Sequence, residues 1–312
     1  MTRPFIVIAG ASGVVGNHLV KAARASYHIK VLTRSINGSE PEGTEPISWK
    51  PEAAFKQDQQ ELERLAEVLS GARAVVNLAG ASISKGRFDE AHKSRVLNSR
   101  INSTKTLVTA ALKSQESPAM WLQASAVGYY GDRGEEELTE DARPQNDFFL
   151  SETALAWENA AQPVGEKCRL VTARLGLVLA KDAPAWQQML LPIKLFIGGP
   201  LGSGKQWYPW IDADDLANAL LYLMANSSSQ GVYNLTAPEP VRQLDLARKA
   251  ASKLGRPAFV PAPRFALRLL LGGLADMLLL PSTRAVPEKL LKEDFHFDYP
   301  NIEAELEHLL GK

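Results

Sequence analysis

A glycine-rich loop near the start of the chain has the residue types that bind phosphate. Residues 10–16 read Gly-Ala-Ser-Gly-Val-Val-Gly, between a short apolar run and a helical pattern. Glycines let the backbone approach a pyrophosphate closely, and free N–H groups at a helix N-terminus favour its negative charge. The alternative is a tight turn that binds no ligand. We expect a dinucleotide here, held by Gly10, Ser12, Gly13, Val14, Val15 and Gly16.

The end of the second predicted strand indicates which dinucleotide binds. Rossmann proteins that bind NAD place Asp or Glu roughly 20 residues after the loop, on the ribose hydroxyls. Here the strand ends in Thr33 and Arg34, and no carboxylate stands beside them. The Arg34 guanidinium matches a 2′-phosphate and Thr33 offers a hydroxyl donor, which favours NADP over NAD. The alternative is that Arg34 is simply an exposed residue at a strand end.

These residues lie in a regular alternation of strand and helix patterns, which predicts βαβ units and a parallel sheet with helices on both faces. The predicted strands are Phe5–Ala9, His28–Thr33, Ala74–Ala79, Ala119–Ser125, Arg169–Leu175 and Gly231–Leu235. The predicted helices are Gly13–Ser26, Asp58–Ser70, Asp89–Lys113, Phe148–Gln162, Pro184–Ile197 and Asp212–Ala225. Asp212 has the residue type and place of a helix N-cap.

The fold class predicted from this alternation is α/β, a Rossmann-type doubly wound parallel sheet with a smaller, mostly helical C-terminal lobe. We expect residues 1–180, completed by about 212–236, to form the NADP-binding domain. Residues 181–211 and 237–312 would then form the substrate lobe, and the crevice between the two lobes is the expected ligand site.

Composition excludes several classes of protein. The 35 Lys and Arg residues balance 35 Asp and Glu residues, which argues against nucleic-acid binding. A single cysteine, Cys168, and scattered histidines give no metal-ligand spacing. The apolar stretch from Phe265 to Leu280 is interrupted by Arg268 and Asp276, so a buried helix pair jointed at Gly272-Gly273 is predicted rather than a membrane span. We expect a cytoplasmic protein with no membrane partner.

A second glycine pattern, from Gly199 to Lys205, fits the start of a P-loop. The next residue is Gln206, which lacks the hydroxyl that binds magnesium, and Pro209 disfavours a following helix. We expect a substrate-side loop in which Lys205 is available to an anionic group.

Several further motifs together carry a family resemblance. They are Asn77-Leu78-Ala79-Gly80, Ser99-Arg100, Ser125-Ala126-Val127-Gly128-Tyr129-Tyr130-Gly131, Trp157-Glu158, Arg174-Leu175-Gly176-Leu177, the glycine loop at residues 198–204 and Trp210-Ile211-Asp212-Ala213-Asp214-Asp215. With these motifs the chain resembles, nearly end to end, an atypical branch of the extended short-chain dehydrogenases/reductases. These are the nucleoside-diphosphate-sugar epimerase-like proteins with a small C-terminal domain.

The resemblance implies roles for residues at several strand ends. Leu78, Ala79 and Gly80 would pass close to the adenosine ribose, and Gly176 and Leu177 would border the nicotinamide. Arg100 would pair with the cofactor phosphates; the alternative for Arg100 is a surface ion pair.

The catalytic residues are where the sequence departs from the resemblance. Working members of the superfamily carry Tyr-x-x-x-Lys on the helix after the serine strand, where lysine lowers the tyrosine pKa for proton exchange. Residues 147–158 here contain neither tyrosine nor lysine. We expect Ser125 to position a substrate carbonyl, and Tyr129 or Tyr130 to replace the missing tyrosine. The alternative for both tyrosines is a packed ring with a hydrogen-bonded hydroxyl.

Two functions remain open from the sequence. The first is an NADP-dependent oxidoreductase or epimerase acting on a nucleotide sugar or a similar hydroxylated small molecule. The second is a non-catalytic NADP(H)-binding sensor or scaffold. The sequence leaves open whether the protein is a monomer or a homodimer.

Overall fold

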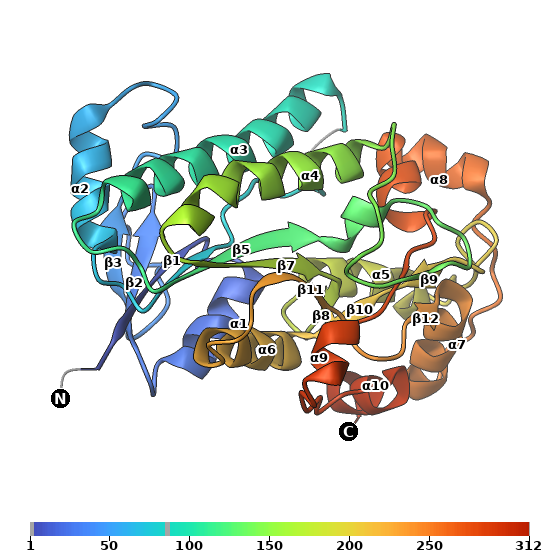
Figure 1. The fold of residues 1–312 in the computed structure, drawn as a ribbon. Helices are drawn as coiled ribbons and strands as arrows, with labels where there is room; N and C mark the ends of the chain where they lie inside the picture. Colours follow the sequence, from blue (N-terminus) through green and yellow to red (C-terminus); the bar gives the residue numbers. More distant parts are fainter. Residues whose placement is uncertain (1–2, 85–87, 312) are drawn as a thin grey trace.

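The computed structural model describes residues 3–84 and 88–311, and its centre is a seven-stranded parallel sheet (Figure 1). Across the sheet the strand order is β11-β7-β5-β4-β1-β2-β3. The bounds are β1 Phe5–Ala9, β2 His28–Thr33, β3 Glu45–Ser48, β4 Ala74–Asn77, β5 Met120–Ala126, β7 Arg169–Leu175 and β11 Gly231–Leu235. The chain runs outward from β1 to β3 and then crosses to β4 on the other side of β1. This reversal creates a topological switch point between β1 and β4.

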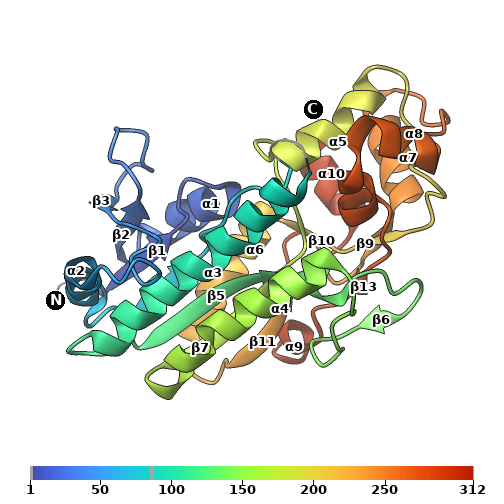
Figure 2. The ribbon, with the colours of Figure 1, turned by 90° about the horizontal axis from the view of Figure 1, so that it is seen from above.

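Helices cover both faces of the sheet. One face carries α1 (Val14–Ala23) and α6 (Ala213–Ala225), and the other carries α2 (Gln59–Leu69), α3 (Glu90–Lys113) and α4 (Phe149–Ala161). Figure 2 shows α3 and α4 lying side by side along the sheet. The observed sheet and its two helical layers confirm the predicted doubly wound α/β class.

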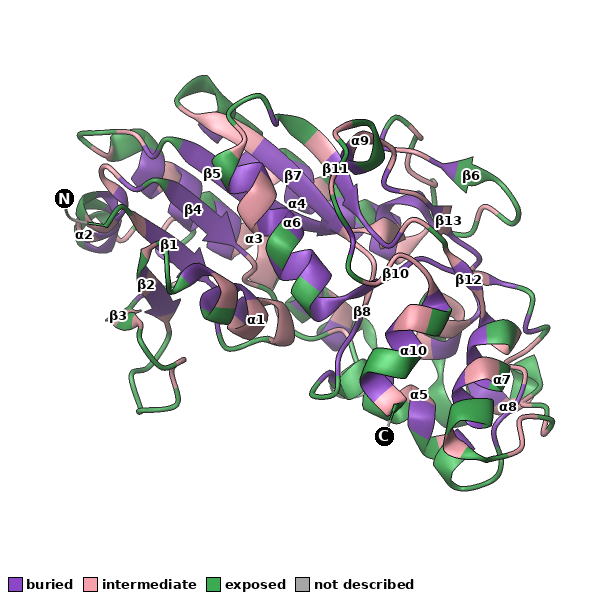
Figure 3. Ribbon diagram, turned by 90° about the horizontal axis from the view of Figure 1, so that it is seen from below, coloured by how far each residue is buried: buried purple, intermediate pink, exposed green. Residues whose placement is uncertain are grey.

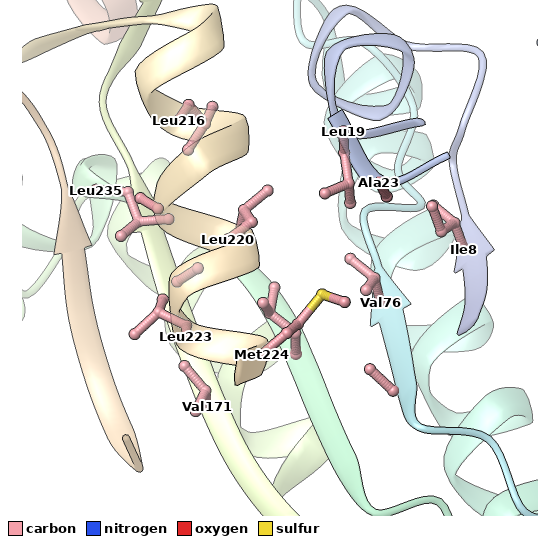
Figure 4. Close-up of a cluster of buried hydrophobic side chains, with 14 of the residues drawn as sticks. Ile8, Leu19, Ala23, Val76, Val171, Leu216, Leu220, Leu223, Met224 and Leu235 are labelled. Atoms are coloured by element: carbon pink, nitrogen blue, oxygen red, sulfur yellow. The ribbon is translucent and has the colours of Figure 1, made fainter. Parts of the chain in front are cut away.

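Apolar side chains of α1 and α6 fill the space beneath the sheet. In Figure 4, Leu19 of α1 and Leu220 of α6 point toward the same region as Ile8, Val76 and Val171 of the strands. The strands read as nearly continuous apolar runs because both of their faces are buried, as expected for a parallel sheet. The sheet is therefore a rigid platform for the loops at its edge.

Four of the remaining helices, α5 (Pro184–Lys194), α7 (Gln243–Leu254), α8 (Arg264–Leu271) and α10 (Ile302–Leu310), gather at one end of the molecule, whereas α9 (Glu288–Lys292) packs beside β11 (Figure 3). Short strands accompany them: β6 Glu137–Leu138, β8 Leu177–Leu179, β9 Trp207–Tyr208, β10 Trp210–Asp212, β12 Val241–Arg242 and β13 Arg284–Ala285. Trp186, Trp210, Leu246 and Leu306 belong to a second apolar core in this region.

Three buried carboxyl groups, those of Asp212, Asp215 and Glu305, cluster at the start of α6 and on α10. Asp212 accepts hydrogen bonds from the backbone N–H groups of Asp214 and Asp215 at 2.7 and 3.1 Å, so it is the N-cap that its position predicts. Asp215 accepts from the backbone N–H groups of Asp298 and Tyr299. Glu305 of α10 is fully buried in the same cluster, where burial and the charges of Asp212 and Asp215 raise its pKa to about 9.

Two sequence expectations about the elements are wrong. Strand β3 was not foreseen, because Glu45–Ser48 is a short edge strand with a proline and little apolar pattern. The segment from Phe265 to Leu280 does form two helical pieces, α8 and Ala275–Leu279, but they are only partly buried. The chain does bend at Gly272, but α8 buries only Leu267, and most of its other apolar side chains face solvent.

Candidate functional site

The glycine loop lies at the switch point, where β1 and β4 end. Gly10 has a φ of +89°, and a Cβ atom there would lie 2.7 Å from the carbonyl oxygen of Leu78. A Cβ on Gly16 would lie 2.5 Å from the Cα of Ala11, so the first turn of α1 packs directly on the loop. Both positions require glycine because backbone meets backbone.

The N-terminus of α1 is exposed where β1 and β4 end. Helix α1 begins at Val14 after Gly13, and no side chain caps its first turn. Ser12 and Gly13 are exposed, and Val14 and Val15 are half-buried. The backbone N–H groups of this turn and the positive end of the helix dipole are therefore available to an anion, as a pyrophosphate site needs.

Arg34 extends into solvent just beyond β2. It is exposed, and no ion pair is recorded for it within residues 3–84 and 88–311. The Thr33 hydroxyl, in contrast, donates to the carbonyl oxygen of Ser35 at 2.9 Å. Of the two predicted ribose contacts, Arg34 is free for a ligand and Thr33 is engaged in its own turn.

The loop after β4 is held by Asn77 and flanked by Arg100. The Asn77 side chain donates to Thr104 and Gln123 and accepts from the backbone N–H of Ala79, which fixes the path of residues 78–80. A Cβ on Gly80 would lie 3.0 Å from Cζ of Arg100, so Arg100 and the loop are in contact. The structure thus brings Leu78, Ala79, Gly80 and Arg100 together beside the glycine loop.

Arg100 is a cation with no carboxylate partner among the described residues. Its Nη1 donates to the carbonyl oxygens of Ala81 and Val96, both at 3.0 Å, and its guanidinium lies 4.9 Å from the Trp157 ring centroid. Burial lowers the Arg100 pKa to about 10, with no compensating charge. The alternative of a surface ion pair is not found in the described part of the chain. Nε and Nη2 make no described hydrogen bond, so they offer a fork for an oxyanion.

Ser125 belongs to a buried polar network rather than to an open surface. Its hydroxyl donates to Oε1 of Glu158 at 2.6 Å, and the same carboxylate accepts two hydrogen bonds from Arg174, at 2.9 and 3.0 Å. All three side chains are buried. Burial alone would lower the Arg174 pKa, but Glu158 and Tyr130 together outweigh it and raise that pKa. In this conformation the Ser125 hydroxyl is engaged by Glu158 rather than presented to a carbonyl.

This network was not predicted from the sequence, although two of its members are charged residues in buried elements. Glu158 and Arg174 appeared only as family motifs. The signal was present, since Arg174 directly follows other buried residues of strand β7 and Glu158 lies on the buried side of α4. Buried charges are stable only when they are paired and hydrogen-bonded, so each one predicts a partner.

The two tyrosines after Ser125 have different surroundings. Tyr130 is fully buried; its hydroxyl donates to Asn234 at 2.7 Å and accepts from Arg174 at 2.9 Å. Burial raises the Tyr130 pKa to about 12, which opposes proton exchange near neutral pH. Tyr129 is 9% exposed, the Arg174 guanidinium lies 3.4 Å from its ring centroid, and its hydroxyl forms no hydrogen bond with a described residue. Tyr130 thus has the packed role that the sequence left as an alternative, and Tyr129 keeps a free hydroxyl.

Gly176 and Leu177 lie where the chain leaves the main sheet. The Gly176 N–H donates to the carbonyl oxygen of Leu235, and the Leu177 N–H donates to that of Pro209 at 2.7 Å. They therefore join the end of β7 to β8 and the second lobe, at the same edge of the sheet as the glycine loop. Within the part of the chain that the structure describes, no group of His, Cys, Asp or Glu side chains has the geometry of a metal site. Among the same residues, no helix has the length and apolar character needed to cross a bilayer.

Comparisons with known proteins agree with this geometry. The sequence profile of the NAD dependent epimerase/dehydratase family matches residues 6–236, and a domain of unknown function (DUF1731) matches residues 262–309. The epimerase family protein YfhF of Bacillus subtilis is 34% identical, over 98% of both chains. A chloroplastic homolog of the epimerase family protein SDR39U1 from Arabidopsis thaliana is 35% identical, over 98% of this chain and 86% of its own.

Solved structures show the same arrangement over nearly the whole chain. Human epimerase family protein SDR39U1, crystallised with NADPH, superposes with a TM-score of 0.86 at 29% identity, covering 98% of both chains. A nucleoside-diphosphate sugar epimerase from Corynebacterium glutamicum has a TM-score of 0.74 at 28% identity, covering 99% of this chain and 59% of its own. Together with the glycine loop at the switch point, these matches show that the chain belongs to the NAD-dependent epimerase/dehydratase family.

Proposed function

We propose that this protein binds NADP(H) at the switch point, across the carboxyl ends of the sheet strands. We further propose that it acts as an oxidoreductase or epimerase on a nucleotide sugar or a similar hydroxylated small molecule. One observation carries the proposal. An uncapped helix N-terminus and two guanidinium groups without described carboxylate partners, Arg34 and Arg100, border the same edge of the sheet. A neutral chain that leaves these positive groups unpaired at one edge is suited to a ligand with several phosphates.

The residues present fit an NADP molecule. The glycine loop and the first turn of α1 would hold the pyrophosphate, and Arg34 would bind the 2′-phosphate. Residues 78–80 would line the adenosine ribose, while Nε and Nη2 of Arg100 would reach an oxygen of the phosphates. The human relative that was solved with NADPH supports the same choice of cofactor.

The bound nicotinamide would supply hydride transfer, and the chain would supply a proton carrier and an orienting group. Tyr129 is the proposed proton carrier, because its hydroxyl is not engaged by a described group, whereas that of Tyr130 is engaged on both sides. Ser125 is proposed as a positioning residue, because its hydroxyl holds the Glu158 carboxylate in place. Gly176 and Leu177 would border the nicotinamide. Lys205 is exposed on the loop of the second lobe and is proposed to bind an anionic group of the substrate.

A second candidate function is a sensor or scaffold that binds NADP(H) without chemistry. The buried network favours it, because Ser125 and Tyr130 are both held by protein groups and α4 carries neither tyrosine nor lysine. Under either function we propose a cytoplasmic monomer or homodimer whose ligands are small molecules rather than nucleic acids.

A binding titration tests the cofactor assignment. We expect NADPH to bind more tightly than NADH, and Arg34→Ala to weaken NADPH by about 10- to 100-fold with little effect on NADH, because one charge-assisted hydrogen-bond pair is lost. Arg73→Ala is the matched control. Arg73 is an exposed arginine that directly precedes β4, so it lies at the amino-terminal end of that strand, away from the glycine loop. Tighter binding of NADH, or an unchanged preference in Arg34→Ala, would refute the assignment.

An isotope-exchange experiment separates the enzyme from the sensor. Wild-type protein is incubated with NADPH labelled at the nicotinamide C4 and with a metabolite extract, and transfer of label to a metabolite is followed. We expect the wild type to transfer label, and we expect the transfer rate of Tyr129→Phe to be at least about 100-fold lower. Loss of a general acid or base can lower a rate by more than this. Cofactor binding without any label transfer would favour the sensor.

A further inference from the structure

The end of the second lobe carries a ridge of exposed apolar side chains. We define this distal ridge as Leu195, Phe196, Ile197, Phe259, Phe265, Leu269 and Leu270. Phe265, Leu269 and Leu270 are 74%, 85% and 79% exposed, and Phe259 is 75% exposed. Single exposed apolar residues are ordinary, but a contiguous group of large ones marks a surface that another body covers.

The residues of the ridge come from three segments, which backbone pairing and the position of α8 bring to the same end of the molecule. The backbone N–H groups of Val260 and Ala262 donate to the carbonyl oxygens of Gly198 and Pro200, so residues 198–201 run beside residues 260–262. This pairing brings the chain that follows Ile197 beside the chain that follows Phe259, and α8 starts two residues after Ala262. Figures 2 and 3 show α5 and α8 gathered at the same end of the molecule, away from the central sheet.

Three exposed cations without a described carboxylate partner lie beside the ridge. Residues 183–211 and 246–275 contain eight lysines and arginines and no aspartate or glutamate, but Lys249 and Lys253 are paired with Glu303 and Glu307 of α10. Lys194, Arg256 and Arg264 beside the ridge are exposed, and the described residues place no carboxylate in an ion pair with them. Arg268 is paired with Asp276. Large apolar groups set among unpaired cations are the composition of segments that lie in a membrane interface.

We propose that the distal ridge docks on the surface of an anionic lipid bilayer, with Phe265 and Leu269 inserted among the lipids and Lys194, Arg256 and Arg264 against their headgroups. A second copy of this chain is a poorer occupant, because a two-fold contact through the ridge would bring its unpaired cations together. The proposal departs from the expectation of no membrane partner. That expectation rested on Arg268 and Asp276, which interrupt the apolar stretch and argue against a spanning helix; docking on a bilayer surface needs no spanning helix.

Vesicle flotation tests the proposal with the full chain. Vesicles of phosphatidylcholine alone are compared with vesicles that contain about one third phosphatidylglycerol. We expect binding to the anionic vesicles and a loss of at least about tenfold in affinity for Leu269→Glu. Removing Lys194 and Arg264 together (K194Q and R264Q) is expected to weaken binding by roughly fivefold for each charge. Salt at about 0.5 M is expected to lower binding in the same way.

Phe55→Glu is the matched control, because Phe55 is 75% exposed on the other lobe, far along the chain from the ridge. It should bind vesicles as the wild type does. NADPH binding should be unchanged in Leu269→Glu, which shows that the variant is folded. No binding of the wild type to anionic vesicles, or equal binding by Leu269→Glu, overturns the proposal. A wild-type dimer in light scattering that Leu269→Glu converts to a monomer overturns it as well, since a second copy would then cover the ridge.

Discussion

Replacing Glu305 by glutamine should change how the stability of the protein depends on pH. Glu305 is fully buried beside Asp212 and Asp215, and neither of its carboxyl oxygens accepts a hydrogen bond from a described donor. Burial first, and then the charges of Asp212 and Asp215, raise its pKa from 4.5 to about 9. Glu305 is therefore protonated in the folded protein at neutral pH.

The sign and size of the effect follow from linkage. An unfolded chain releases the Glu305 proton near pH 4.5, whereas the folded chain keeps it to about pH 9. The stability that this group contributes is complete below the lower value and is lost as pH rises through the window. The loss is about 1.4 kcal/mol per pH unit, hence about 2 kcal/mol between roughly pH 6.5 and 8.0. Glutamine has no such proton, so Glu305→Gln should lack this loss.

Urea unfolding of both proteins across that range measures the difference directly. Asp215 has a pKa raised to about 6, and starting above that value keeps its titration out of the comparison. Glu303→Gln is the control on the same helix, because Glu303 is exposed and bonded to Lys249, which lowers its pKa. Parallel stability curves for wild type and Glu305→Gln, to within about 0.5 kcal/mol, would show that the buried carboxyl is not protonated as argued.

Three further substitutions test the rest of the site. Gly16→Ala should destabilise the protein by about 1–3 kcal/mol in urea unfolding and weaken NADPH binding, because its Cβ meets the Ala11 backbone. Tyr130→Phe should cost about 1–3 kcal/mol, by leaving the Asn234 oxygen unpaired, but should preserve label transfer from NADPH; abolished transfer in a folded variant would make Tyr130 catalytic. Asn77→Ala should weaken NADPH binding, since it frees the loop after β4, but should leave label transfer from the nicotinamide C4 of bound NADPH nearly constant. Unchanged NADPH binding would contradict the positioning role of Asn77.

The repeating pattern of apolar strands and amphipathic helices was enough to predict the sheet. Phe5–Ala9, Arg169–Leu175 and Gly231–Leu235 match the observed strands residue for residue. The glycine spacing likewise predicted the turn at Gly10, because only a close backbone contact explains glycines at those positions. Such local signals come from covalent geometry and burial, which the sequence records directly.

Long-range side-chain partners were not predictable in the same way. The hydroxyl of Ser125 is bonded to Glu158, which is 33 residues away, and that of Tyr130 to Asn234, which is 104 residues away. The burial of residues 265–280 was predicted wrongly because an apolar run has the same composition whether another element covers it or not. Such distinctions depend on tertiary contacts that no sequence period encodes.

The strand β11 has a consequence for how the protein is made. It pairs with β7 along its whole length, yet residues 176–230 of the chain lie between the two strands. A ribosome must therefore synthesise residues 176–230 before β11 can pair with β7, and until then β7 presents unpaired backbone at a sheet edge. A nascent chain that stops near residue 180 thus exposes β7 as an unpaired edge strand, and chaperone binding or aggregation should be greatest at that stage of translation.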